Sequence, residues 1–327
     1  MNKNILITGG AGYVGAVLVP KMLLKGYNVT VLDLMIYGEN ILSNHKNLKK
    51  VKGDIRNKEL LKEILPGHDV VIHLACISND PSFELDPQLG KSINLDAFRP
   101  LVDFSFSSGV KRFIYASSSS VYGIKEKKNV NEATALEPLT DYSKFQADCE
   151  VILSEYNCTD FITTTIRPAT VCGYSPRQRL DLVVNILTNL AYHKREISVF
   201  GGEQLRPNLH IEDMTDLYCL LLEEPDHKIA GKIFNAGDIN HSVKELAEIV
   251  RSVIGNDVKL VQTPSDDNRS YHISSAKIKK EISFAPKYGI RRAVADLQEA
   301  FEKRLLTDSL TDPKYFNVKM MNLINLK

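Results

Sequence analysis

Ile5-Leu6-Ile7-Thr8-Gly9-Gly10-Ala11-Gly12-Tyr13-Val14-Gly15 joins an apolar run to a cluster of glycines near the start of the chain. A helical pattern follows at once, and Gly9, Gly12 and Gly15 are spaced three residues apart. In a strand–turn–helix, the first glycine permits the tight turn, the second lets a diphosphate approach bare backbone, and the third lets the helix pack closely on the strand. The helix then points its N-terminal N–H groups at the phosphates. This stretch predicts a dinucleotide-binding turn rather than an ordinary connection between a strand and a helix.

A second predicted strand, residues 28–33, ends on Asp33, which lies 24 positions after Gly9. That distance is close to the spacing expected for a carboxylate that accepts hydrogen bonds from a ribose. Such a carboxylate repels a 2′-phosphate, and residues 34–37 contain no Arg or Lys that would attract one. The predicted cofactor is therefore NAD rather than NADP.

The composition of the chain excludes several classes of protein. Its 327 residues carry a formal net charge of +1, with 43% hydrophobic and 25% charged residues, which is ordinary for a soluble globular protein and gives no reason to expect nucleic acid or a membrane as partner. No apolar run reaches the ~18 residues that span a bilayer, and the chain starts in a strand pattern rather than a signal peptide. The five cysteines show no metal-ligand spacing, which predicts reduced thiols, a cytoplasmic location and no metal site.

From residue 4 to about 167, short apolar strands alternate with helical segments. The pattern predicts an α/β fold of the Rossmann type, a doubly wound parallel sheet that binds ligands beyond the carboxyl ends of its strands. We expect an NAD-binding domain over residues 1–167, a smaller substrate-binding α/β part over 168–306 and an unassigned tail over 307–327. The predicted strands are 4–8, 28–33, 48–52, 69–75, 111–117 and 161–166, and the predicted helices are 13–26, 57–65, 84–109, 141–157, 182–191, 214–222, 242–254 and 290–305.

Candidate site residues follow directly after several of these strands. Asp54 and Ile55 can hold an adenine by its edge and one face, but Asp54 can equally cap the helix that comes next. His73 fits a core histidine better than a catalytic one. Four serines, residues 117–120, end the fifth strand, and the next helix opens near Tyr142. A serine hydroxyl and this phenol can therefore form a proton-transferring pair over a nicotinamide.

Together these motifs resemble the extended short-chain dehydrogenase/reductase superfamily, and within it the NAD-dependent sugar-nucleotide epimerases and dehydratases of which UDP-glucose 4-epimerase is typical. The similarity covers about residues 4–305. The matching motifs are, in order, Thr8 to Gly15, Asp33, Gly53-Asp54-Ile55, His73-Leu74-Ala75, the serines with Val121-Tyr122-Gly123, Tyr142-Ser143-Lys144, Arg167-Pro168, Arg206 with His210-Ile211-Glu212-Asp213, and Arg269-Ser270-Tyr271.

The resemblance implies an enzyme that uses NAD to convert a nucleotide-activated sugar through a keto-sugar, with Ser118 and Tyr142 as its catalytic residues. The implied cofactor contacts are Gly9, Gly12, Tyr13, Val14, Gly15, Asp33, Asp54, Ile55, Leu74, Ala75, Cys76, Tyr142, Gln146 and Pro168. The implied substrate contacts are Ser78, Asn79, Ser118, Thr170, Arg179, Val199, Arg206 and Arg269. Within this set, Arg206 and Arg269 would clamp the diphosphate of the substrate, because the planar guanidinium pairs bidentately with phosphate oxygens.

A homodimer is also implied, formed by the helices predicted at 84–109 and 141–157. The first of these helices has an apolar face that fits a dimer interface and packing on the sheet equally well. This face consists of Leu95, Phe98, Leu101 and Val102.

Two departures from the family pattern bear on the reaction. The related 4,6-dehydratases have acidic residues at the two positions after the catalytic serine, where this chain has Ser119 and Ser120, which cannot act as acid and base at neutral pH. Epimerisation is therefore predicted in preference to dehydration. Position 146 is Gln, where the family has a lysine that binds the nicotinamide ribose and lowers the pKa of the catalytic phenol. Lys144 is only two residues from Tyr142 on a helix and faces another direction.

Three interpretations of the function therefore stay open: an epimerase, a dehydrogenase that stops at the keto-sugar, and a protein that binds NAD and a nucleotide sugar but turns over poorly because Gln146 carries no charge. Arg177 and Arg179 are open as well. Each can contact a diphosphate or form an ion pair at the surface.

Overall fold

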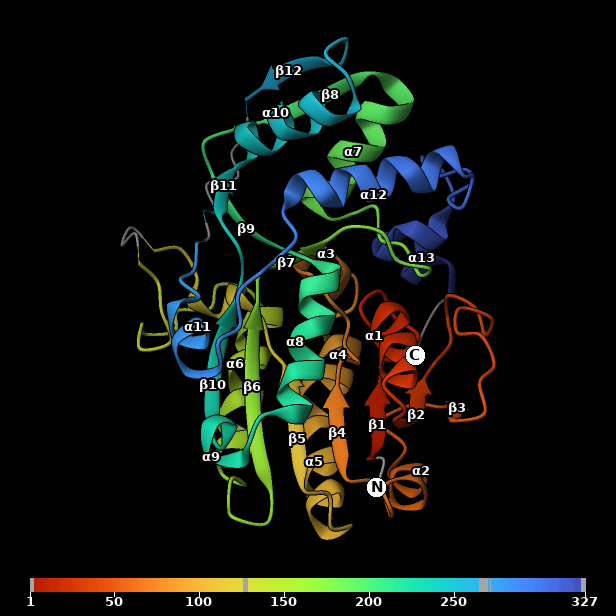
Figure 1. Cartoon of the computed structure of the whole chain (residues 1–327), viewed down its shortest axis with the longest axis vertical. Helices are drawn as coiled ribbons and strands as arrows, with labels where there is room; N and C mark the ends of the chain where they lie inside the picture. Colours follow the sequence, from red (N-terminus) through yellow and green to blue (C-terminus); the bar gives the residue numbers. More distant parts are fainter. Residues whose placement is uncertain (1–2, 126–128, 265–269, 271, 325–327) are drawn as a thin grey trace.

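A computed structural model describes residues 3–125, 129–264, 270 and 272–324. Its centre is a sheet of seven parallel strands in the order β10-β6-β5-β4-β1-β2-β3 (Figure 1). The predicted doubly wound parallel sheet is confirmed, and so is each of the six strands predicted for it. The strands are β1 (Asn4–Thr8), β2 (Asn28–Asp33), β3 (Leu48–Lys52), β4 (Val70–His73), β5 (Arg112–Ala116), β6 (Ile162–Pro168) and β10 (Lys232–Ala236).

Helices cover both faces of this sheet, because successive side chains of a strand point to opposite faces and both sets are apolar. Ile5 and Ile7 face the layer of α1 (Gly15–Leu24) and α8 (Ile211–Glu223). Leu6 faces the opposite layer. That layer consists of α2 (Lys58–Ile64), α5 (Phe98–Ser107) and α6 (Asp141–Ser154).

The helix predicted at 84–109 is wrong as a single element. The chain forms α3 (Asp80–Phe83), α4 (Pro87–Lys91), a π-helical turn (Ser92–Asp96) and α5 instead. Pro87 starts a new helix because it lacks the N–H that a continuing helix needs, and the Asp86 side chain caps the new N-terminus. Phe98, Leu101 and Val102 are fully buried against the sheet. The structure thus assigns this apolar face to the core rather than to an interface.

The second part of the chain stands beyond the carboxyl ends of the sheet strands, toward which the arrows in Figure 1 point. It contains two small sheets and three helices that pack against one another around a separate core. The first small sheet consists of β7 (Thr170–Cys172), β9 (Leu205–His210) and β11 (Asn240–Ser242), and the second of β8 (Glu196–Phe200) and β12 (Lys259–Thr263). The helices are α7 (Val183–Lys194), α10 (Val243–Ile254) and α12 (Ile290–Glu302).

A boundary at residue 167 is too simple for this arrangement. Strand β10 pairs with β6 at the edge of the large sheet, and α8 packs on α1. Two short helices, α9 (Asp226–Ile229) and α11 (Ala276–Ile282), lie beside these returning segments (Figure 1). The chain therefore crosses between the two parts several times after β6, which couples them more tightly than two consecutive domains would be.

The segment after α12 belongs to the folded molecule. A short 3₁₀ turn (Pro313–Tyr315) leads into α13 (Asn317–Ile324). Tyr315 is 4% exposed and packs with Leu180 and Phe301, and its carbonyl accepts a hydrogen bond from the Leu180 N–H at 2.9 Å. Helix α13 also contacts α3. The tail therefore touches both parts of the protein.

Three further features concern membrane spans, metal sites and the cysteines. Within the described ranges, no helix combines the length and apolar character needed to cross a membrane. In the same ranges, no three His, Cys, Asp or Glu side chains come together as a metal site would require. All five cysteines are free thiols.

Candidate functional site

The glycine turn after β1 is built by close approach of the backbone. Gly9 has φ +71°, and a Cβ there would lie 2.6 Å from the Ala75 nitrogen. A Cβ on Gly15 would lie 2.3 Å from the carbonyl oxygen of Gly10, so these two glycines are required by the packing of the turn itself. A Cβ on Gly12 would meet only the Gly9 carbonyl, at 3.1 Å. Gly12 therefore presents bare backbone to the space in front of it, as a diphosphate-binding turn needs.

That space is a cavity of about 580 Å³ at the carboxyl ends of the strands, within the range of small-molecule sites. It lies between the large sheet and the second part of the chain. Every residue predicted to contact the cofactor lines it, from Gly9 to Pro168. Of the predicted substrate contacts, those that line it are Ser78, Asn79, Ser118, Thr170, Arg179 and Arg206.

Two predicted substrate contacts are not placed there. Val199 lies on β8, is 4% exposed and packs in the core of the second part with α7 and α10. Its side chain is therefore not among those that line the cavity. Arg269 lies outside the residues that the structure describes.

Asp33 is fixed at the end of β2. Its carboxylate accepts hydrogen bonds from the N–H groups of Ala11, at 3.0 Å, and Met35, at 2.8 Å. Burial raises the pKa of Asp33, while these N–H groups and the charge of Arg177 oppose the rise. The carboxylate thus faces the cavity with its orientation already set, which suits a group that accepts hydrogen bonds from a ribose.

The structure separates the two roles considered for Asp54. The helix that follows is capped by Asn57, whose side chain accepts the N–H groups of Glu59 and Leu60. Asp54 lines the cavity and forms an ion pair with Arg56 at 2.6 Å. Burial favours a higher pKa for Asp54, but the hydrogen bonds from Arg56 outweigh it and lower the pKa. Asp54 is thus not the helix cap.

His73 is a core residue, as predicted. Its Nδ1 lies 2.7 Å from the Thr8 hydroxyl, and its ring packs on Phe98 and Tyr115. Burial lowers the pKa of His73 to about 3. The imidazole is therefore neutral and carries no charge toward the cavity.

Ser118 and Tyr142 line the same cavity from different elements. Ser118 caps the 3₁₀ turn that follows β5, accepting from the Ser120 N–H at 3.1 Å, and its Oγ lies 2.8 Å from the Ser120 Oγ. Tyr142 lies in the first turn of α6. Burial is the largest effect on the Tyr142 phenol and raises its pKa, and hydrogen bonds from Gln146 and Ser118 work against that rise.

Gln146 is held by a chain of hydrogen bonds. The Tyr115 hydroxyl donates to Gln146 Oε1, which leaves Gln146 Nε2 to donate to the Tyr142 oxygen at 3.3 Å. The amide thus points a donor at the phenol from the position where the family has lysine. Lys144 is exposed and pairs with Asp141 at 3.1 Å, which confirms that it does not replace the lysine.

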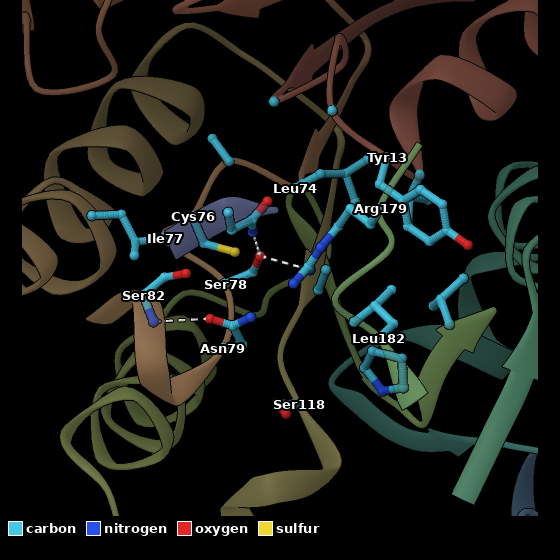
Figure 2. Close-up of a pocket in the computed structure, with 18 of the residues that line it drawn as sticks. Tyr13, Leu74, Cys76, Ile77, Ser78, Asn79, Ser82, Ser118, Arg179 and Leu182 are labelled. Carbon is cyan, nitrogen blue, oxygen red and sulfur yellow. Dashed lines mark hydrogen bonds between the residues drawn. The ribbon is translucent and has the colours of Figure 1, made fainter. Parts of the chain in front are cut away.

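The opposite wall of the cavity carries Arg179, which is 7% exposed and is therefore no surface residue. Its guanidinium pairs with Asp181, through Nε at 2.9 Å and Nη2 at 3.2 Å, and Nη1 donates to the Ser78 hydroxyl at 3.0 Å. Figure 2 shows this last bond reaching across the cavity from one part of the chain to the other. Asn79 beside it accepts the Ser82 N–H at 3.0 Å and so starts α3 (Figure 2).

The cavity residues that were not predicted as contacts include a cluster of Tyr37, Arg177 and Asn317. The sequence left Arg177 open between contact with a diphosphate and an ion pair at the surface, and the structure shows that it is buried, with 4% exposure. The tail residue Asn317 accepts hydrogen bonds from Arg177 at 2.7 Å and from the Tyr37 hydroxyl at 3.0 Å. The sequence gives no sign of this cluster, because its members come from three distant segments.

The fold and the cavity define a Rossmann-type protein that binds a dinucleotide at a glycine turn and brings a phenol and a serine hydroxyl to the same space. The sequence profile described as "NAD dependent epimerase/dehydratase family" matches residues 5–237. The chain belongs to this family, whose cofactor is NAD, and the predicted resemblance is confirmed.

Characterised relatives match over most of their length. A UDP-glucose 4-epimerase of Lactobacillus helveticus is 27% identical over 306 residues, which cover 87% of this chain and 92% of the relative. A dTDP-glucose 4,6-dehydratase of Streptomyces niveus is 25% identical over 335 residues, 95% of this chain and 96% of the relative. The crystal structure of a UDP-glucose 4-epimerase of Thermotoga maritima with UDP-glucose superposes with a TM-score of 0.82 at 26% identity, covering 92% of this chain and 99% of that one.

Proposed function

We propose that this protein is an NAD-dependent enzyme that converts a nucleotide-activated sugar through a keto-sugar, and that its simplest reaction is epimerisation. The observation that supports this most is the meeting of the Tyr142 phenol and the Ser118 hydroxyl in the cavity that the glycine turn opens into. Bound NAD supplies reversible hydride transfer. The residues of the chain supply binding, orientation and the movement of a proton.

The NAD fits the residues present. Gly12 offers open backbone where the diphosphate approaches, and Asp33 offers a fixed acceptor for the ribose. Leu74, Ala75 and Cys76 follow β4 and line the cavity beside the turn. These groups would hold the cofactor with its redox-active end toward the serines and Tyr142.

Tyr142 would accept the proton of the sugar hydroxyl as the carbon bearing it becomes a carbonyl, and would return the proton when the carbonyl is reduced. Ser118 would donate a hydrogen bond to the same oxygen as its charge changes. Reduction on the other face of the keto-sugar then inverts the carbon. Arg206, which lines the cavity, would pair with the phosphates of the nucleotide, and Arg179 would contact the substrate.

Similarity alone does not choose between the two reactions of the relatives, since identity to the epimerase is 27% and to the dehydratase 25%. The choice rests on residues 119 and 120. Both are serines that line the cavity, and a neutral hydroxyl cannot remove or deliver the proton that dehydration requires at neutral pH. This favours an epimerase, and a dehydrogenase that stops at the keto-sugar is the second candidate.

The test is to incubate the purified protein with NAD and with UDP-glucose or dTDP-glucose, following NADH absorbance and product identity by NMR. An epimerase yields the inverted sugar with no net NADH, while a dehydrogenase accumulates NADH and a keto product. The matched control is Tyr142→Phe, which keeps the ring and removes the proton acceptor, and it should lower turnover by about 10²- to 10⁴-fold. A Tyr142→Phe variant as active as the native protein would refute the assignment.

We also infer that the protein forms a homodimer through the outer surfaces of α5 and α6. Phe106 on α5 and Val151 on α6 are 48% and 62% exposed, which is high for large apolar side chains on neighbouring helices. Sedimentation of the native chain should give twice the monomer mass, and Val151→Glu should shift it toward monomer. A native chain that sediments as a monomer at micromolar concentration would contradict the inference.

A further inference from the structure

Arg177 is a buried cation that the second part of the chain carries to the glycine turn. It belongs to the loop between β7 and α7, which is hydrogen-bonded to Tyr13 near the end of the glycine turn. The Tyr13 hydroxyl donates to the Gly173 carbonyl at 2.6 Å, and the Ser175 hydroxyl donates to the Tyr13 carbonyl at 2.7 Å. These contacts fix where the loop lies, so the position of Arg177 relative to the turn is set by the fold.

The guanidinium of Arg177 is only partly satisfied. Nη2 donates to Asn317 Oδ1 at 2.7 Å, and the guanidinium carbon lies 3.4 Å from the centre of the Tyr37 ring. Nε and Nη1 are buried, and neither has a hydrogen-bond partner in the part of the chain that the structure describes. Arg179, two residues later, has a carboxylate, Asp181, on its fork.

A buried guanidinium with two unused donors is costly to maintain without an anion. Burial lowers the pKa of Arg177 only to about 10, so the group keeps its charge at neutral pH. Removing a charge from water without a partner costs several kcal/mol, and buried donors in native proteins are nearly always paired. Since Arg177 lines the cavity, the missing partner is expected to be an anionic ligand within it.

The surroundings of Arg177 indicate which anion this is. Its guanidinium stacks on the ring of Tyr37, four residues after Asp33 at the end of β2, and the loop that carries it is hydrogen-bonded to Tyr13 in the glycine turn. In a Rossmann site the adenosine ribose lies at the end of the second strand, and the diphosphate lies at the glycine turn. We propose that the buried guanidinium of Arg177 binds the diphosphate of NAD from the second part of the chain, on the adenosine side.

Asn317 makes the tail part of this site as a positioning residue. Besides accepting from Arg177, its backbone N–H donates to Asp181 at 3.0 Å and its Nδ2 donates to the Ser78 hydroxyl at 3.2 Å. The tail is thus anchored to both walls of the cavity and fixes the guanidinium through Nη2. The pairing depends on NAD dependence alone and holds whichever sugar reaction the enzyme performs.

The test compares ligands that contain or lack the diphosphate. The full chain is freed of nucleotide with charcoal, and affinities for NAD, ADP-ribose and adenosine are measured by calorimetry for the native protein, Arg177→Met and Arg177→Lys. Arg177→Met should weaken the binding of NAD and ADP-ribose by about 10- to 100-fold and leave the affinity for adenosine within about twofold of the native value. Arg177→Lys should lie in between, because it keeps the charge and loses the planar fork. Arg195→Met, which removes an exposed arginine paired with Asp257, is the matched control and should change none of the three affinities.

Thermal melting separates ligand binding from a structural role. If Arg177 binds an anionic ligand, unliganded Arg177→Met should melt at a temperature no lower than that of the unliganded native protein. Saturating NAD should then raise the melting temperature of the variant less than that of the native protein. Equal losses of affinity for ADP-ribose and adenosine in Arg177→Met would overturn the proposal. So would a lower melting temperature of unliganded Arg177→Met combined with the full NAD-induced rise. A loss of affinity confined to NADP, or to UDP-glucose on the NAD-loaded protein, would also overturn the proposal. If Arg177→Met does not fold, Arg177→Lys decides by the same comparison of ADP-ribose with adenosine.

Discussion

Helix α6 carries two buried polar clusters one turn apart, and they are satisfied in different ways. The amide cluster consists of Tyr142, Gln146 and Tyr115, joined by hydrogen bonds between neutral groups. The charged cluster consists of Glu150, Arg167, Ser117 and Tyr122. Residues 146 and 150 lie on the same face of the helix. Tyr142 and Gln146 of the amide cluster line the cavity, as does Ser117, while the Glu150–Arg167 ion pair is not part of its lining.

The charged cluster is closed on itself. Arg167 donates to Glu150 through Nε at 3.0 Å and Nη2 at 2.5 Å, and through Nη1 to the Tyr122 hydroxyl at 2.8 Å. Burial would lower the pKa of Arg167, yet Glu150 raises it above its usual value, so Arg167 keeps its charge. The Ser117 hydroxyl donates to the same carboxylate at 2.5 Å. A buried charge is kept here because every part of it has a partner.

The amide cluster, by contrast, consists of neutral side chains. A lysine at 146 would place a cation beside Tyr142, whereas Gln146 supplies only a dipole. Among the described residues, the groups with the largest effects on the Tyr142 pKa include no cationic side chain. The difference between the clusters teaches that α6 keeps its buried ion pair apart from the Tyr142 phenol: the ion pair holds the helix to β6, and the phenol has neutral hydrogen-bond partners, Gln146 and Ser118.

The largest expected effect comes from opening the charged cluster. Glu150→Ala leaves Arg167 buried without its carboxylate and should lower the free energy of unfolding by about 3–5 kcal/mol, measured by urea denaturation. Glu59→Ala is the control, since Glu59 pairs with Lys62 on the exposed face of α2. It should cost less than about 1 kcal/mol.

Adding Arg167→Met to Glu150→Ala should recover part of this loss, because the uncompensated charge is then removed. A loss from Glu150→Ala no greater than that from Glu59→Ala would contradict the closed-cluster interpretation. In that case α6 would owe its attachment to apolar packing alone.

Much of the large sheet could be predicted from the sequence, because its strands are apolar on both faces and short-range patterns specify them. The glycine turn could be predicted as well, since Gly9, Gly12 and Gly15 lie close together in the chain and their spacing reflects the local geometry. The small sheets of the second part were not predicted. Strand β9 reads Leu205-Arg-Pro-Asn-Leu-His, which has no apolar alternation, and its pairing with β7 and β11 depends on segments far along the chain.

The candidate site divides in the same way. Residues that follow strands of the large sheet, such as Asp33 and Ser118, were placed at the cavity because parallel strands end at one edge. Asn317 was missed and the role of Arg177 stayed open, because 140 positions separate the two residues and only the folded chain brings them together. Val199 was assigned by resemblance, while the structure packs its side chain in the core of the second part.

The smaller effect, and the sharper test of the comparison, comes from restoring charge to the amide cluster. Only the phenolate of Tyr142 can accept the sugar proton, and burial raises the pKa of Tyr142, so turnover of the native enzyme should rise with pH through the neutral and alkaline range. Gln146→Lys places a cation beside the phenol and lowers that pKa. The same phenolate fraction is then reached at lower pH, so turnover at pH 7 should increase by about tenfold or more, and the two pH profiles should converge at high pH.

Gln146→Met is the matched control, because it fills a similar volume without donating a hydrogen bond to Tyr142, and it should slow turnover rather than speed it. The measurement is the pH dependence of kcat for the three proteins, with KM recorded to exclude a change in substrate binding. A Gln146→Lys variant with an unchanged profile would show that the native phenol already obtains its positive charge elsewhere, with bound NAD the nearest source. A gain of several orders of magnitude would instead show that the native chain is mainly a binding protein, since its neutral cluster would then be withholding most of the catalytic power of the fold.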